Sequence, residues 1–388
     1  MIHINKLFLI FVNLILVTGC ASNLTNNITQ EEETLVIKKN EINYKFNKLP
    51  KEINVVIAGS SEDRSKDFLN GLLTNYFYYK KNSKYSPNIK FFTKHKLDTS
   101  NCQIFPESQG FYIVFLNDEL LKDLDLNCLN KILKVQGLFI NLIEGINVKG
   151  QNQKILTITR QEEYLGFLKY AKNLGNNNAI IIDDDETKDK EVIERLWVDI
   201  GGNVLGSSTS ENKNNETLLS DLLLIQRSKE RTRKLGRALS VALDSTPRRR
   251  ADVDSIFFSG SITKARSLKP EVEYNFGESI SVYMLPSWNK NDNYFSKELD
   301  LERVVLVDMP WMLNFKTNYI KNLPKDRRRS FALGFDSYEI ALLLKNPNSS
   351  RKFKLSGMSG ETTLQNGRLE RKSLKVIVKE GFFEVLGY

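Results

Sequence analysis

Residues 179–206 read AIIIDDDETKDKEVIERLWVDIGGNVLG and contain a short apolar run, an amphipathic stretch and a second short run in succession. An almost entirely apolar run such as Ala179 to Ile182 is typical of a strand that is buried on both faces of a sheet. The apolar positions between Glu191 and Ile200 predict a helix, and Asn203 to Gly206 predicts the next strand. This order predicts a parallel sheet with covering helices.

The same alternation continues in both directions along the chain. Strands are predicted at 53–58, 89–93, 111–116, 138–143, 155–159, 255–258, 280–284 and 304–307, and helices at 66–79, 161–174, 218–243, 263–274 and 331–344. In the tail, Asn366-Gly367 lies between alternating segments, and Asn-Gly suits a turn that needs positive φ. The predicted fold class is therefore α/β, with mostly parallel sheets that end in antiparallel strands.

The N-terminal residues 1–19 have the layout of an export signal. Lys6 precedes an apolar run from Leu7 to Val17, which is shorter than the ~20 residues that span a membrane. Small residues then precede Cys20 and complete a lipobox, so we predict that Cys20 carries acyl chains. The alternative is an ordinary secretory signal followed by a chance cysteine.

Residues 20–50 are rich in Asn, Thr, Glu and Lys and are predicted to form a lipidated tether. Because Ala21 rather than aspartate follows Cys20, we expect the outer membrane, with the protein facing the periplasm. Cys102 and Cys128 would share that oxidising compartment and permit one disulfide. Their spacing alone does not establish the bond.

Much of the formal net charge of +9 is concentrated in one segment. The sequence between positions 227 and 250 contains nine basic residues but only two acidic ones, Glu230 and Asp244. Within this segment Arg248, Arg249 and Arg250 precede two aspartates. These arginines either pair with the aspartates and fix the loop, or form a surface that contacts a partner. Export argues against nucleic acid as that partner.

Catalytic and cofactor motifs have little support. Gly59-Ser60-Ser61 follows the first strand, but no phosphate-binding glycine motif does, and no cofactor is predicted. Once the signal is removed, His95 is the only histidine, so no His-rich metal cluster is expected. Ser261 and Lys264 match the S-x-x-K motif of penicillin-interacting enzymes, although no K-T-G occurs. Ser261 or Thr263 as a helix N-cap explains this position without chemistry, so we expect a non-enzyme.

Several segments in sequential order resemble the LppC/LpoA family of penicillin-binding-protein activators. They are RSKERTRKLGRALSVALDSTPRRRADVDSIFFSGSITKARSLKP (227–270), SVYMLPSW (281–288), RVVLVDMPWML (303–313), RRRSFALGFDSYEIALLL (327–344) and LSGMSGETTLQNGRLERKSLKVIVKEG (355–381). The resemblance implies an outer-membrane lipoprotein with a type I periplasmic-binding-protein-like domain. It also implies binding and activation of a class A penicillin-binding protein, a peptidoglycan synthase. The helical-repeat domain usual at the N terminus of that family has no counterpart in this sequence.

This fold implies two lobes joined by three chain crossings. We expect residues 51–157 plus 283–360 in lobe 1 and residues 158–282 plus 361–388 in lobe 2. A ligand cleft would lie at the carboxyl ends of the strands, with Gly59, Ser60 and Ser61 as candidate residues. The side chains of Arg248, Arg249, Arg250, Trp288 and Trp311 are of the types that dominate interfaces, although Trp311 also fits a core position. The second hypothesis is a solute-binding lipoprotein that closes on a small molecule such as an amino acid.

Overall fold

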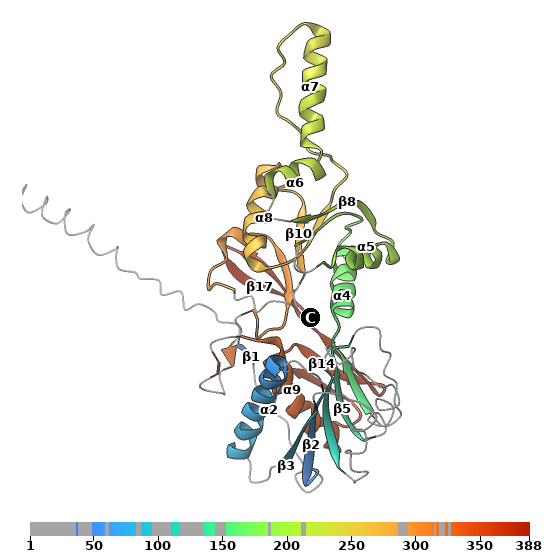
Figure 1. Ribbon diagram of the computed structural model, residues 1–388, viewed down its shortest axis with the longest axis vertical. Helices are drawn as coiled ribbons and strands as arrows, with labels where there is room; N and C mark the ends of the chain where they lie inside the picture. The colour runs from blue at the N-terminus through green and yellow to red at the C-terminus, as the bar shows by residue number, and fades with distance from the viewer. Residues whose placement is uncertain are drawn as a thin grey trace, which may run out of the picture. The chain divides into compact units, whose positions relative to one another are not determined.

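The computed structural model describes residues 36–37, 49–58, 62–82, 87–94, 110–116, 135–143, 153–184, 188–210, 215–285, 294–313, 316–317, 323–324 and 327–388. Most of these residues belong to two mainly parallel sheets and their helices (Figure 1). None of the described helices combines the length and the apolar character needed to cross a membrane.

The first sheet has five parallel strands, as the short apolar runs predicted. In spatial order they are β3 (Asn88–Lys94), β2 (Glu52–Ala58), β4 (Phe111–Leu116), β5 (Gly137–Asn141) and β6 (Gln153–Thr157). Helices α2 (Glu62–Asn82) and α9 (Arg329–Lys345) pack against each other, and α9 contacts β4 and β5. Phe68 of α2 stacks on Phe115 of β4 with ring centroids 4.2 Å apart, so both helices bury apolar side chains against this sheet.

Two glycines let α2 and α9 approach each other closely. A Cβ atom on Gly334 of α9 would lie 1.9 Å from the carbonyl oxygen of Phe68. A Cβ atom on Gly71 of α2 would lie 2.0 Å from the carbonyl oxygen of Phe331. Beside this contact the Asn75 side chain donates a hydrogen bond of 2.7 Å to the Phe335 carbonyl. The two helix backbones therefore touch at this crossing.

The second sheet has seven strands and contains both strands of the segment 179–206. In spatial order the strands are β17 (Phe382–Gly387), β16 (Leu374–Lys379), β11 (Val305–Asp308), β10 (Ser281–Leu285), β9 (Ser255–Ser259), β7 (Asn178–Asp184) and β8 (Asn203–Ser210). β16 and β17 are antiparallel to their neighbours, whereas the other pairs are parallel. The expected closing antiparallel strands on a parallel framework are confirmed.

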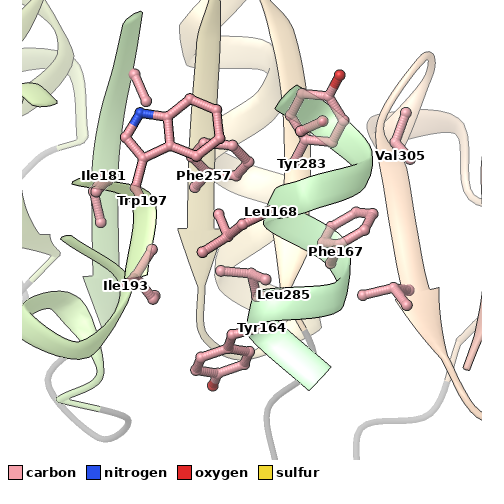
Figure 2. Close-up of a cluster of buried hydrophobic side chains, with 13 residues drawn as sticks. Tyr164, Phe167, Leu168, Ile181, Ile193, Trp197, Phe257, Tyr283, Leu285 and Val305 are labelled. Atoms are coloured by element: carbon pink, nitrogen blue, oxygen red, sulfur yellow. The ribbon is translucent and has the colours of Figure 1, made fainter. Parts of the chain in front are cut away.

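Aromatic side chains dominate the core beside this sheet (Figure 2). Tyr164 and Phe167 of α4 (Arg160–Asn173) and Trp197 of α5 (Lys190–Asp199) pack on strand residues that include Phe257. The rings of Trp197 and Phe257 meet edge to face, with centroids 4.8 Å apart. Gly202 has no side chain because a Cβ atom there would lie 2.2 Å from the Trp197 indole. The residues 179–206 thus form a strand, a helix and a strand around one buried tryptophan.

A third, antiparallel sheet is formed near the C terminus. It consists of β13 (Phe353–Ser356), β14 (Glu361–Gln365) and β15 (Arg368–Lys372). Asn366 and Gly367 connect β14 to β15 with φ angles of 49° and 79°, which confirms the predicted positive-φ turn. The Lys154 ammonium donates a 2.7 Å hydrogen bond to the Gly367 carbonyl and so joins this hairpin to β6.

The expected lobe boundaries differ from the observed sheets. The boundary at residue 283 is wrong, because β10 pairs with β9 along residues 281–285 and β11 pairs next to it in the same sheet. The chain leaves the seven-stranded sheet only after Asp308. The boundary at residue 361 is also wrong, because β14 and β15 pair with β13, and the chain returns at β16. Within the predicted tether, β1 (Val36–Ile37) pairs with β12 (Lys316–Thr317).

Buried ion pairs lie where the chain passes between the sheets. Asp308 at the end of β11 accepts hydrogen bonds from Nε and Nη2 of Arg329 in the first turn of α9, at 3.1 and 2.5 Å. Burial raises the pKa of Asp308, and the facing guanidinium opposes that rise. Glu163 of α4 pairs with Arg371 of β15 and also accepts a 2.6 Å hydrogen bond from the Ser373 hydroxyl. These two pairs connect elements that are distant in sequence.

Asp336 of α9 adds a third buried acidic group near these crossings. Its carboxylate accepts hydrogen bonds from the backbone N–H of Met358 at 2.9 Å and from the backbone N–H of Ser359 at 2.6 Å. Burial raises the pKa of Asp336 to about 6, although the hydrogen bonds from Ser359 and Met358 favour the ionised form. The turn between β13 and β14 is therefore held on α9 by a single carboxyl group.

Candidate functional site

The basic excess of the sequence lies mainly on one projecting element. We name residues 225–250 the basic arm: it consists of helix α7 (Ile225–Leu239) and the segment 240–250 that returns from the end of this helix. Ile225 is the buried residue of α7, and every other residue of the helix is exposed or partly exposed. Figure 1 accordingly shows α7 standing away from the sheets. The arm contributes almost nothing to the core.

The arm begins at a break that the sequence did not predict. The single helix expected over 218–243 is wrong, because Leu224 adopts a left-handed conformation with φ 58° between α6 (Asn215–Leu222) and α7. After Ile225 the next large apolar residue is Leu235, so the intervening turns offer no side chain that could bind the core. The helix therefore turns away from the fold at this position.

The return segment lies along one side of α7. Hydrogen bonds join them, including Arg248 N–H to Ser228 Oγ (2.9 Å), the Thr232 and Ser245 hydroxyls (2.9 Å), and Val241 N–H to the Gly236 carbonyl (3.0 Å). Gly236 is required at the tip because a Cβ atom there would lie 2.9 Å from the Val241 carbonyl oxygen. The arm is thus a helix with one covered side.

The remaining surface of α7 is basic. Six exposed cations lie on the helix, namely Arg227, Lys229, Arg231, Arg233, Lys234 and Arg237, with Glu230 as its single acidic residue. Several of the cations are three or four residues apart, where like charges destabilise a helix. Leu235 and Leu239 are also exposed near the tip, by 53% and 57%. We name the six cations the basic face.

The three arginines singled out from the sequence lie at the base of the arm, and two of them bind the protein itself. Arg249 donates hydrogen bonds to the Phe276 carbonyl at 2.9 Å and to the Ser279 hydroxyl at 2.7 Å. Arg250 forms a bidentate ion pair with Asp252, with hydrogen bonds of 2.6 and 2.7 Å. These hydrogen bonds lower the pKa of Asp252. The side chain of Arg248 is exposed. The loop-fixing interpretation therefore describes Arg249 and Arg250.

Asp254 has a different partner from the one expected. Its carboxylate accepts hydrogen bonds from the backbone N–H groups of Asn177 at 2.8 Å and Asn178 at 3.0 Å. It therefore fixes the start of β7 rather than an arginine. Together with the Arg250 pair, this contact anchors the chain between the arm and β9.

Ser261 is placed as a helix cap. Its hydroxyl oxygen accepts a hydrogen bond of 3.3 Å from the backbone N–H of Lys264 at the start of α8 (Ile262–Tyr274). The Lys264 ammonium donates a 2.8 Å hydrogen bond to the Ser210 carbonyl. The N-cap interpretation of Ser261 is confirmed, since the hydroxyl oxygen satisfies an N–H group of the first helical turn.

Residues 192–374 match a protein family whose description is "LppC putative lipoprotein". This match covers just under half of the chain. Over these residues the chain is similar to the LppC family. The matched residues contain the whole basic arm, the strands β8 to β11 and the three-stranded sheet. The family resemblance found in the sequence is confirmed.

One similar protein is the penicillin-binding protein activator LpoA of Aliivibrio fischeri (strain ATCC 700601 / ES114). It is 26% identical over 157 residues, which are 38% of this chain and 26% of that protein. The match therefore spans about a quarter of that curated relative.

Two solved structures share the fold. The LpoA (YraM) C-domain from Haemophilus influenzae, described as a regulator of PBP1A, superposes with a TM-score of 0.53 at 13% identity, covering 86% of this chain and 99% of that one. An ABC transporter substrate-binding protein from Desulfitobacterium hafniense gives a TM-score of 0.50 at 13% identity, covering 86% and 100%. The periplasmic-binding-protein-like fold class is confirmed.

Several candidate residues lie outside the described ranges. They are Cys20, Gly59, Ser60, Ser61, Cys102, Cys128 and Trp288. Trp311 is described and is 2% exposed, with the Arg327 guanidinium 4.7 Å from its ring centroid, so it belongs to the core. Among the described residues, no group of three or more His, Cys, Asp or Glu side chains is close enough together to hold a metal ion.

A cavity of about 350 Å³ lies beside the chain crossings, between α4 and the connection from β15 to β16. Charged residues of both signs line it, but Arg371 is engaged by Glu163. Lys375 lies over the Tyr170 ring, 5.4 Å from its centroid, and burial lowers the pKa of this lysine. The cavity therefore lies within the packing between the sheets. As a candidate binding surface we favour the basic face, whose six cations are exposed.

Proposed function

We propose that this chain binds and activates a class A penicillin-binding protein and so regulates peptidoglycan synthesis. The observation that carries the proposal is the family match over residues 192–374, together with relatives named as penicillin-binding protein activators. The H. influenzae C-domain of the same fold is described as a regulator of PBP1A. In this proposal the chain acts by docking, because Ser261 and Lys264 are engaged in local hydrogen bonds.

Stimulation of a purified synthase tests this function. The full lipidated chain, in detergent, is added to the class A synthase of the same organism with its lipid-linked substrate. We expect the fraction of cross-linked peptides in the product to rise with chain concentration and then saturate, as a binding equilibrium requires. A saturating complex without any rise in cross-linking would contradict activation, and no complex at all would contradict docking.

We further propose that Cys20 is acylated and holds the chain in the outer membrane, facing the periplasm. Each buried methylene contributes about 0.8 kcal/mol, so several acyl chains anchor a protein firmly whereas one chain binds reversibly. Replacement Cys20→Ser is therefore expected to abolish palmitate labelling and release the chain from the membrane fraction. Membrane retention of unlabelled Cys20→Ser protein would exclude this anchor.

The solute-binding hypothesis rests on the fold alone. The likeness to the D. hafniense substrate-binding protein at 13% identity concerns the arrangement of strands and helices. The cavity of about 350 Å³ is large enough for a small ligand, but part of its lining is the ion pair of Glu163 and Arg371, which is already engaged within the fold. We therefore retain docking to a synthase as the proposed function.

A further inference from the structure

The basic face of α7 is an unusual surface because its six cations are accompanied by a single acidic residue on the helix, Glu230. None of the six cations forms an ion pair with an acidic side chain within the described part of the chain. Arg231 makes only a long hydrogen bond of 3.5 Å, to the carbonyl of Arg227. Like charges three and four residues apart repel one another along such a helix. A partner of opposite charge would relieve this repulsion.

The residue types favour carboxylates as the binding groups of the partner. Four of the six cations are arginines, whose planar guanidinium groups bind carboxylates with two parallel hydrogen bonds. Arg250 forms a pair of this kind with Asp252 at the base of the same arm. From Arg227 to Arg237, which are ten positions apart, the helix rises ~15 Å, enough to face several acidic side chains in a row.

The covered side of the arm argues against a lipid surface as the binding partner. A helix that lies in a membrane interface needs an open, continuous apolar side opposite its cations. On α7 that side is occupied by the return segment, through Ser228, Thr232 and Gly236. The large apolar side chains exposed on the arm are Leu235, Leu239, Val241 and Leu243, which lie near its tip. A small apolar patch beside arginines is typical of a protein interface.

We propose that the basic face of α7 is a docking surface for a carboxylate-rich segment of a protein partner, with Leu235 and Leu239 as apolar contacts at its end. This proposal rests on the proposed function for the identity of the partner, which is the class A synthase. Arg249 and Arg250 are not part of this surface, because they hold the base of the arm.

Charge reversal on the basic face tests the proposal. The double variant Arg231→Glu/Lys234→Glu is compared with Arg351→Glu/Lys352→Glu, which changes the charge equally at exposed residues before β13. Binding is measured by titration against the synthase, against poly-L-glutamate and against phosphatidylglycerol vesicles, with circular dichroism to confirm folding. We expect the arm variant to lose at least about tenfold affinity for the synthase and the polypeptide, and the control to retain wild-type affinity.

A conservative variant separates carboxylate recognition from simple charge attraction. Arg227→Lys/Arg231→Lys keeps the charge but removes the guanidinium forks, so we expect weaker binding to the synthase than in wild type. Salt should weaken the wild-type complex, because exposed charges are screened over about 8 Å at physiological ionic strength.

The outcomes distinguish this proposal from the proposed function. Equal affinity of the wild type and the arm variant for the synthase overturns the docking surface and leaves activation standing. Binding of poly-L-glutamate through the arm, without any binding of the synthase, supports the surface and overturns the proposed partner. Binding of the vesicles in an arm-dependent manner, with no binding of either polypeptide, overturns the carboxylate proposal in favour of a lipid.

Discussion

Replacement of Arg329 by alanine is expected to destabilise the protein by about 3–5 kcal/mol, because it leaves a buried carboxylate without its counter-ion. Arg329 is 7% exposed and Asp308 is 2% exposed, so solvent cannot replace the guanidinium. The Asp308 carboxylate would keep only the 2.7 Å hydrogen bond from the Met309 backbone N–H and a long 3.5 Å contact with the Tyr294 hydroxyl. The loss is measured as the change in unfolding free energy by chemical denaturation.

The exposed pair of Lys379 and Glu384 provides a control for the buried pair. These side chains approach to 2.6 Å, but both are 53% exposed. Lys379→Ala is therefore expected to cost less than about 1 kcal/mol. A double replacement of Asp308 and Arg329 by apolar residues of similar size is expected to cost less than Arg329→Ala alone, since no charge remains buried. Similar stabilities for Arg329→Ala and Lys379→Ala would show that the Asp308 pair is not desolvated.

The strands were predictable because a strand that is buried on both faces appears in the sequence as a short, nearly all-apolar run. The runs that became β2, β4 and β7 are nearly all apolar, and each is buried on both faces in the structure. Asn366-Gly367 was predictable for a different reason, since few residue pairs adopt positive φ at low cost. Both signals are local, and they depend little on the rest of the chain.

The sheet boundaries and the helix break depended on distant contacts. β10 and β11 look like any other buried strands, so the sequence does not tell which sheet they join. The break at Leu224 involves a residue with no special preference for left-handed φ. After Ile225 the sequence has no large apolar residue before Leu235, so the helix has nothing to pack on the core. The sequence showed this stretch as an excess of basic residues, but that excess was not taken to mean that the helix leaves the core.

The candidate site was found only in part. The charge pattern located the segment from Arg227 to Arg250, but it did not separate the exposed cations of α7 from Arg249 and Arg250, which bind backbone carbonyls or Asp252. The pair of Asp308 and Arg329 was not predicted, because its partners come from different elements. Pairing of that kind is set by tertiary packing, which charge counting along a sequence does not reveal.

Gly334→Ala is expected to destabilise the protein by about 3 kcal/mol or more, the upper end of the usual cost of overpacking. The cost is high because the added methyl group meets backbone atoms rather than a movable side chain. The new Cβ atom would lie 1.9 Å from the Phe68 carbonyl oxygen and 2.7 Å from its carbon. Relief requires α2 and α9 to separate, which would weaken the packing of Phe68 on Phe115. Thermal or chemical unfolding measures the loss.

Gly166 of α4 is the matched control, because it is also a helical glycine but a Cβ atom there meets nothing within 4 Å. Gly166→Ala is expected to stabilise the protein by up to about 1 kcal/mol, since alanine loses less backbone entropy in a helix. Gly71 lies at the same crossing as Gly334, so the double variant Gly71→Ala/Gly334→Ala should cost less than the sum of the two single changes. Once the first methyl group has separated the helices, the second finds part of its space already open. Strict additivity, or a neutral Gly334→Ala variant, would mean that the two backbones do not touch at this crossing.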